Sequence, residues 1–125
     1  MKRKLYNSLI EWKNDPDRKP LVLEGARQVG KTWLLKEFGK NEFDNLLYVN
    51  CHDDERMQNL FQHDLHVDRI MQALQAFSGQ PIITGKTLIF IDEIQEAYRG
   101  LDSLKYFCEN ARDQHIVVAG SLLGV

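Results

Sequence analysis

Four short apolar runs divide the chain, and each has the length of a buried strand. They cover residues 21–23, 46–49, 88–91 and 116–119, and the run at 88–91 is the most apolar of the four. Strands that are apolar throughout are typical of a parallel sheet with helices on both faces. The pattern therefore predicts an α/β fold with right-handed crossovers between its strands.

The segments between these runs carry apolar residues at helical spacing. A first helix is expected over residues 3–14, where Asp15-Pro16-Asp17 ends it. A second is expected from Lys31 to Phe38, with Gly39 as its stop. Further helical patterns cover residues 54–61, 67–77 (closed by Gly79) and 101–111. The positions expected to face inward on the second helix are Trp33, Leu34, Leu35 and Phe38.

Length and composition limit the class of protein. The chain has 125 residues, of which 43% are hydrophobic and 27% charged, the mix of an ordinary globular domain. No apolar run is long enough to cross a membrane, and Glu11 and Lys13 interrupt any signal-peptide core, so we expect no membrane partner and a cytoplasmic location. Cys51 and Cys108 are too few for a disulfide framework, and their apolar neighbours indicate reduced core thiols.

The charge is unevenly distributed. Residues 1–40 hold ten Lys or Arg against five Asp or Glu, whereas residues 41–125 hold six against thirteen. A basic first third suits nucleic acid or another polyanion, and equally a solvated surface around a phosphate site. No stripe of aromatic and basic residues indicates single-strand binding. His63 and His66 lie three apart, but no third metal ligand is patterned near them.

The segment from Gly25 to Thr32 fits G-x-x-x-x-G-K-[ST] in full, between a predicted strand and a predicted helix. Gly25 and Gly30 permit a backbone whose N–H groups cradle phosphate oxygens, and the helix start adds its positive dipole end. Lys31 is then expected to reach the β- and γ-phosphates, and the Thr32 hydroxyl to ligate Mg²⁺. The expected nucleotide-binding residues are Gly25, Ala26, Arg27, Gln28, Val29, Gly30, Lys31, Thr32 and Trp33. Arg27 could touch phosphate, reach a neighbouring subunit or stay solvated.

A second motif follows sixty residues later, where the apolar run at 88–91 ends in Asp92 and Glu93. The carboxyl edge of a parallel sheet is where open α/β folds bind ligands. There Asp92 is expected to hold Mg²⁺, and Glu93 to take a proton from an attacking water. An apolar strand ending in two acids is a weak signal alone, because acids also cap helices. After a full phosphate loop it becomes strong.

The whole chain resembles the N-terminal AAA-type ATPase domain of a group of bacterial and archaeal ATP-binding proteins that carry a C-terminal domain of unknown function. Three stretches carry the resemblance: residues 19–32, 88–95 and 119–125. The resemblance implies a three-layer P-loop sheet in which the strand at 116–119 lies between those at 21–23 and 88–91. It also assigns Ser121 to the position that senses the γ-phosphate or the attacking water, and it offers Gln95 as a residue that orients water.

The resemblance further implies another strand, a lid-like helical region and a C-terminal domain. We therefore expect residues 1–125 to form a partial ATPase domain, with a helix at 3–14 and a nucleotide-binding core at 20–125, that is incomplete at its C-terminus. The sheet edge left open would favour self-association.

Together these features predict Mg²⁺-dependent binding and hydrolysis of ATP, with Glu93, Lys31 and Ser121 as catalytic residues and with Thr32 and Asp92 as metal ligands. Two alternatives stay open: a nucleotide-gated interaction module with little turnover, and a P-loop kinase. What the hydrolysis would drive, and any protein or nucleic-acid partner, is not encoded in a recognisable motif.

Overall fold

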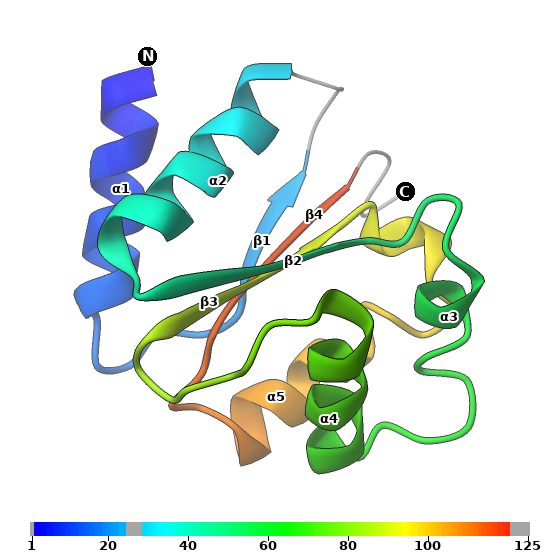
Figure 1. Cartoon of the computed structure of the whole chain (residues 1–125). Coiled ribbons are helices and arrows are strands. Elements are labelled where there is room, and N and C mark those ends of the chain that lie inside the picture. Colours follow the sequence, from blue (N-terminus) through cyan, green and yellow to red (C-terminus); the bar gives the residue numbers. More distant parts are fainter. Residues whose placement is uncertain (1, 25–28, 121–125) are drawn as a thin grey trace.

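The arrangement of the strands confirms the predicted α/β class (Figure 1). The computed structural model describes residues 2–24 and 29–120. Within these residues β1 (Leu21–Glu24), β2 (Asn45–Asn50), β3 (Thr87–Asp92) and β4 (His115–Gly120) form one parallel sheet. Its order is β1-β4-β3-β2. The last strand along the chain therefore lies between the first and the third, as the family resemblance implies.

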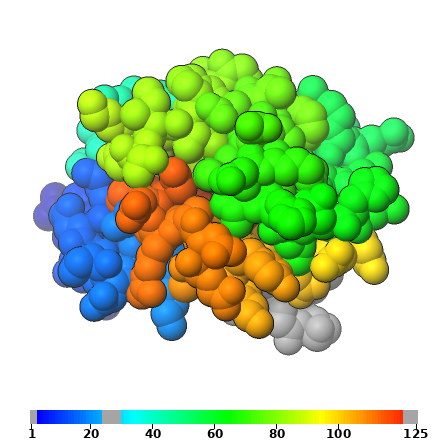
Figure 2. Space-filling model, turned by 90° about the horizontal axis from the view of Figure 1, so that it is seen from below, coloured from blue at the N-terminus to red at the C-terminus, as the bar shows by residue number. Residues whose placement is uncertain are grey.

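Helices cover both faces of the sheet and make three layers (Figure 1). One face carries α1 (Lys2–Asn14) and α2 (Val29–Glu42). The other carries α3 (Glu55–Gln58), α4 (Val67–Ser78), a short 3₁₀ helix η1 (Ile94–Glu96) and α5 (Ser103–Asn110). Viewed from below, α5 and the segment that leads into α4 lie side by side on the surface (Figure 2).

The strand residues alternate between two separate cores, as the pleat of a strand requires. Leu88 and Phe90 of β3 point toward α1 and α2, where they meet Leu35 and Phe38. The next residues along the strand, such as Ile89, join the larger core beneath α4 and α5. All six residues of β3 are buried, which explains why this run is the most apolar in the sequence.

The end of α4 follows the prediction, but the end of α2 does not. Gly79 closes α4 with a left-handed backbone at φ 73°, a conformation that costs glycine little. Gly39 was predicted to stop α2, yet the helix continues to Glu42. A Cβ at residue 39 would lie 2.7 Å from Cδ1 of Leu46, so this glycine allows the helix to approach β2 closely. The prediction mistook a packing glycine for a cap.

The orientation of Trp33 also differs from the prediction, which had this side chain facing inward. Leu34, Leu35 and Phe38 are buried as predicted, but Trp33 is 54% exposed. Successive helix residues are about 100° apart, so the three buried residues already fill the arc that faces the sheet. Trp33 therefore projects from the helix outside that arc.

Candidate functional site

The described parts of the two sequence motifs lie at one edge of the sheet, where the strands end. The first turn of α2 and the carboxyl ends of β1 and β4 lie on the same side of the molecule (Figure 1). Asp92 is the last residue of β3, the strand beside β4. Parallel strands bring all their carboxyl ends to one edge, so this topology places the two sequence motifs near each other.

The phosphate-loop segment is described only in its second half. Gly25, Ala26, Arg27 and Gln28 lie outside the described residues. The next four residues, 29–32, form the first turn of α2, in which Lys31 and Thr32 are half-buried. That turn holds no acidic residue. The positive end of the helix dipole therefore faces no carboxylate from its own first turn, as an anion site requires.

Asp92 is buried, with only 8% of its surface exposed, and two donors hold its carboxylate. The Tyr48 hydroxyl donates to Oδ2 over 2.9 Å, and the backbone N–H of Glu93 donates to Oδ1 over 2.9 Å. Since Asp92 is two residues past Phe90 on an alternating strand, it lies on the face covered by α2. Each oxygen keeps a further lone pair, so the carboxylate can still bind a cation.

Glu93 follows in a strained backbone conformation. Its φ of 54° and ψ of 46° are left-handed, a region that residues other than glycine rarely adopt. The chain turns there from β3 into η1, and Gln95 Nε2 donates to Glu93 Oε1 over 3.2 Å. Backbone strain of this kind is concentrated at functional sites. The side chain of Glu93 is half-exposed and so stays accessible to water.

Tyr48 is a polar contact at this edge whose role the sequence did not reveal. It lies on β2 and pairs in register with Phe90, while Asn50 pairs with Asp92. Burial, and then its hydrogen bond to Asp92, raise the pKa of Tyr48 to about 12, so the phenol stays protonated and donates. The available signal was the alternation of polar Tyr48 and Asn50 with Val49 at the carboxyl end of this strand.

The remaining predictions concern Ser121, the two cysteines and the histidine pair. Ser121 is not among the described residues; β4 ends at Gly120 beside Glu24 of β1. Cys51 is buried, and burial raises the pKa of its thiol to about 12; Cys108 is half-buried, and both are unpaired. Across residues 2–24 and 29–120 no three His, Cys, Asp or Glu side chains are grouped to hold a metal, which leaves His63 and His66 without a third ligand.

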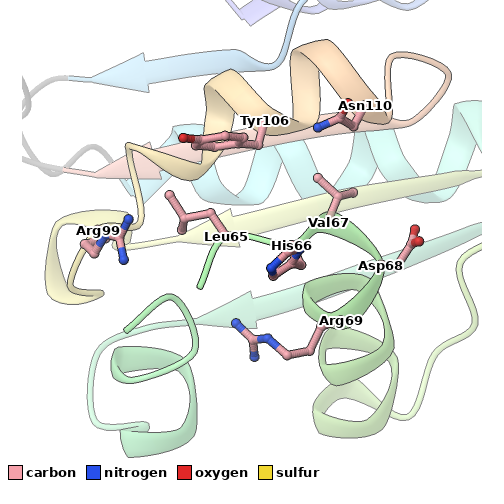
Figure 3. A pocket seen from close by; sticks show the side chains of 8 residues that line it. All are labelled: Leu65, His66, Val67, Asp68, Arg69, Arg99, Tyr106 and Asn110. Atoms are coloured by element: carbon pink, nitrogen blue, oxygen red, sulfur yellow. The ribbon is translucent and has the colours of Figure 1, made fainter. Parts of the chain in front are cut away.

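A cavity of about 780 Å³ lies on the opposite face, between α4 and α5 (Figure 3). Tyr106 and Asn110 of α5 face the start of α4 there, where His66, Val67 and Asp68 also line the cavity. Arg69 in its wall is held by Asp64, whose Oδ1 accepts from Nε over 2.8 Å. Among the residues that the structure describes, no predicted site residue lines this cavity, so it is separate from the edge that carries Asp92.

No described helix is long and apolar enough to span a membrane. Neither the curated proteins nor the solved structures include a match to this sequence. Residues 17–125 match the AAA domain family, whose members are nucleotide-binding, ATPase-like domains. The match covers the sheet, the start of α2 and the acidic end of β3. Since the match spans well over half of the sequence, the chain belongs to the AAA domain family.

Proposed function

We propose that this chain binds ATP together with Mg²⁺ at the edge formed by the start of α2 and the ends of β1, β4 and β3, and that it hydrolyses the terminal phosphoanhydride bond. Water is the acceptor, so the products are ADP and inorganic phosphate. The observation that carries the proposal is the buried, doubly hydrogen-bonded carboxylate of Asp92 on the face that α2 covers.

The donor set at this edge suits Mg²⁺, which prefers hard oxygen ligands and retains several waters. Asp92 offers a carboxylate with unused lone pairs, and Thr32 offers a hydroxyl in the first turn of α2. These two residues would hold the ion. When bound, Mg²⁺ neutralises phosphate charge and orients the terminal phosphate groups.

The phosphates themselves would be bound by the loop at residues 25–30 and by Lys31. Backbone N–H groups at a helix start are anion donors, so those at the start of α2 would bind phosphate oxygens, and the helix dipole would add to the attraction. Lys31 would place its ammonium group against the β- and γ-phosphates, where negative charge accumulates during transfer. The exposed ring of Trp33 lies one residue beyond Thr32 and remains a predicted contact to nucleotide.

Glu93 is proposed to take the proton of the attacking water. The chain turns at this residue from β3 into η1, and the amide of Gln95 donates to one carboxylate oxygen. The other oxygen has no described hydrogen bond and can accept a proton, as a general base must. Ser121 is assigned to the γ-phosphate by the family resemblance alone.

Titration calorimetry with ATP tests binding, once in excess Mg²⁺ and once in EDTA. We expect binding that is at least tenfold tighter in Mg²⁺. Lys31→Ala should remove most of the affinity, whereas Lys40→Ala, an exposed lysine in the last turn of the same helix, should not change it. Equal affinity of Lys31→Ala and the parent chain would refute the assignment of the phosphate site.

Release of inorganic phosphate tests the chemistry. Glu93→Gln should bind ATP normally and lose turnover, by roughly the 10²–10⁴-fold that general-base catalysis contributes. Glu109→Gln, an exposed glutamate on α5, is the matched control and should keep its turnover. Phosphate found on a second acceptor would indicate a kinase. Tight binding with almost no release of phosphate would indicate a nucleotide-gated module.

A further inference from the structure

A chain of three side chains links α2 to the end of β3. The ammonium nitrogen of Lys36 lies 4.1 Å from the centre of the Tyr48 ring, and the Tyr48 hydroxyl donates to Asp92 over 2.9 Å. The three residues come from α2, β2 and β3, so the contact crosses from the helical layer to two neighbouring strands. Neither of the two sequence motifs contains Lys36 or Tyr48.

Lys36 lies on the same face of α2 as Thr32. Residues four apart on a helix lie one above the other on the same side, and Thr32 and Lys36 have this spacing. The same helix packs against β2 and β3 through Leu35 and Phe38, so its distance from Tyr48 is fixed by the core. The contact of the Lys36 cation with the Tyr48 ring therefore keeps Tyr48 next to the face of α2 that carries the predicted metal ligand Thr32.

The direction of the Tyr48 hydrogen bond is also fixed. Asn50 Oδ1 accepts from the backbone N–H of His52 over 2.8 Å, which sets the orientation of its amide. The amide nitrogen of Asn50 then donates to the Tyr48 oxygen over 3.3 Å. Since that oxygen already accepts from Asn50, the phenolic proton is directed to Asp92.

We propose that Tyr48, braced by Lys36, is a positioning residue that fixes the rotation of the Asp92 carboxylate and so prepares it for Mg²⁺. This inference rests on the proposed function, because it assigns a role toward the same ion. The terminal torsion of an aspartate is broad when nothing holds it. With one oxygen on Tyr48 and the other on the Glu93 amide, the carboxylate is held in one orientation before the ion arrives.

The measurement is the ratio of two ATP dissociation constants, that in EDTA divided by that in saturating Mg²⁺. Tyr48→Phe keeps the ring that packs edge-on against Phe90 at 5.0 Å and removes only the hydroxyl. We expect the ratio to fall about tenfold, the size of a hydrogen bond to a charged group. The affinity in EDTA should stay unchanged, because the phenol contacts the carboxylate and not the phosphates.

Tyr6→Phe is the matched control. The Tyr6 hydroxyl also donates to a carboxylate over 2.9 Å, that of Glu42, and its ring also packs edge-on against a phenylalanine, Phe38. It lies in α1, and its hydroxyl bonds to the last residue of α2, at the end of that helix opposite Thr32. A purely structural role for such a hydroxyl would lower stability toward urea in either variant without changing the ratio. Of these two tyrosine variants, only Tyr48→Phe should change the ratio.

Lys36 provides a second variant that leaves Tyr48 and Asp92 in place. Lys36→Met keeps the aliphatic stem and removes the charge, and we expect the ratio to fall about threefold, in line with a partly exposed cation–π contact. Lys36→Arg, which restores a cation over the ring, should recover the parent ratio.

The outcomes separate this inference from the proposed function. A parent chain with a large ratio, combined with a Tyr48→Phe ratio within twofold of it, overturns the positioning role and leaves the proposed function intact. A parent chain whose ATP affinity does not depend on Mg²⁺ overturns both. A selective fall in Tyr48→Phe and Lys36→Met, with Tyr6→Phe unchanged, supports the inference.

Discussion

His115, at the start of β4, should make the stability of the fold depend on pH between about 4 and 6.5. Its Nδ1 lies 3.3 Å from an Arg18 nitrogen and its Nε2 lies 3.2 Å from the carbonyl oxygen of Lys13. Arg18 can only donate and a carbonyl can only accept, so the ring is neutral, with its proton on Nε2. The rings of Trp12 and Phe43 pack edge-on against it.

Protonating His115 in the folded state is unfavourable. Burial, and next the positive charge of Arg18, lower the pKa of His115 from 6.5 to about 4. The unfolded chain therefore binds more protons than the folded chain between these two values, and stability falls as the pH is lowered through that range. At 1.36 kcal/mol per unit, the whole effect is about 3 kcal/mol, of which about 2 kcal/mol should be lost between pH 7 and pH 5.

Urea unfolding of the parent chain and of His115→Gln at pH 7, 6 and 5 measures this effect. Glutamine can accept from Arg18 and donate to the Lys13 carbonyl, but it does not titrate. The carboxylates titrate in both proteins, so their contribution cancels in the comparison. The parent should be the more stable protein at pH 7, and its advantage should shrink by about 2 kcal/mol at pH 5. An advantage that stays constant within 0.5 kcal/mol, taken as about the error of such differences, would refute the reasoning.

Three further predictions concern stability and reactivity. Gly39→Ala should lower the free energy of unfolding by about 1 kcal/mol, because the close contact with Leu46 outweighs the helix propensity of alanine; a gain in stability would contradict the packing role. Asp54→Ala should cost about 1 kcal/mol in urea unfolding, since Asp54 Oδ1 caps α3 through the N–H groups of residues 56 and 57, and Asp54→Asn should recover most of that loss. In a thiol-reactive dye assay Cys108 should react before Cys51, whose thiol is buried with its pKa raised to about 12; equal rates in the folded chain would show that β2 opens readily.

The sequence predicted the elements well wherever burial alone determines the pattern. All four apolar runs are strands, and the helical pattern at 67–77 with its closing Gly79 is α4. The strand order came from the family resemblance, because no local pattern states which strands are neighbours. The order in the structure agrees with it.

The errors arise where the role of a residue depends on which other element packs against it. In the sequence Gly39 is typical of a helix end, and only the structure shows that it packs closely against Leu46 of β2. In the sequence Tyr48 is typical of a core aromatic residue. Only the register of β2 and β3, which pairs Asn50 with Asp92, shows that Tyr48 lies near that carboxylate. Tyr48 and Asp92 are 44 positions apart, so no local pattern contains their contact, and the close approach of Gly39 to Leu46 depends on how α2 packs on β2.

The central position of β4 has a consequence for synthesis of the chain. Within the described sheet β1 pairs only with β4, so Leu21 finds its partner Val117 only after nearly the whole described chain has been made. Pairings this distant in sequence form slowly and leave strand edges exposed while they form. As residues leave the ribosome, β1 must therefore wait for His115–Gly120 before it can join the sheet.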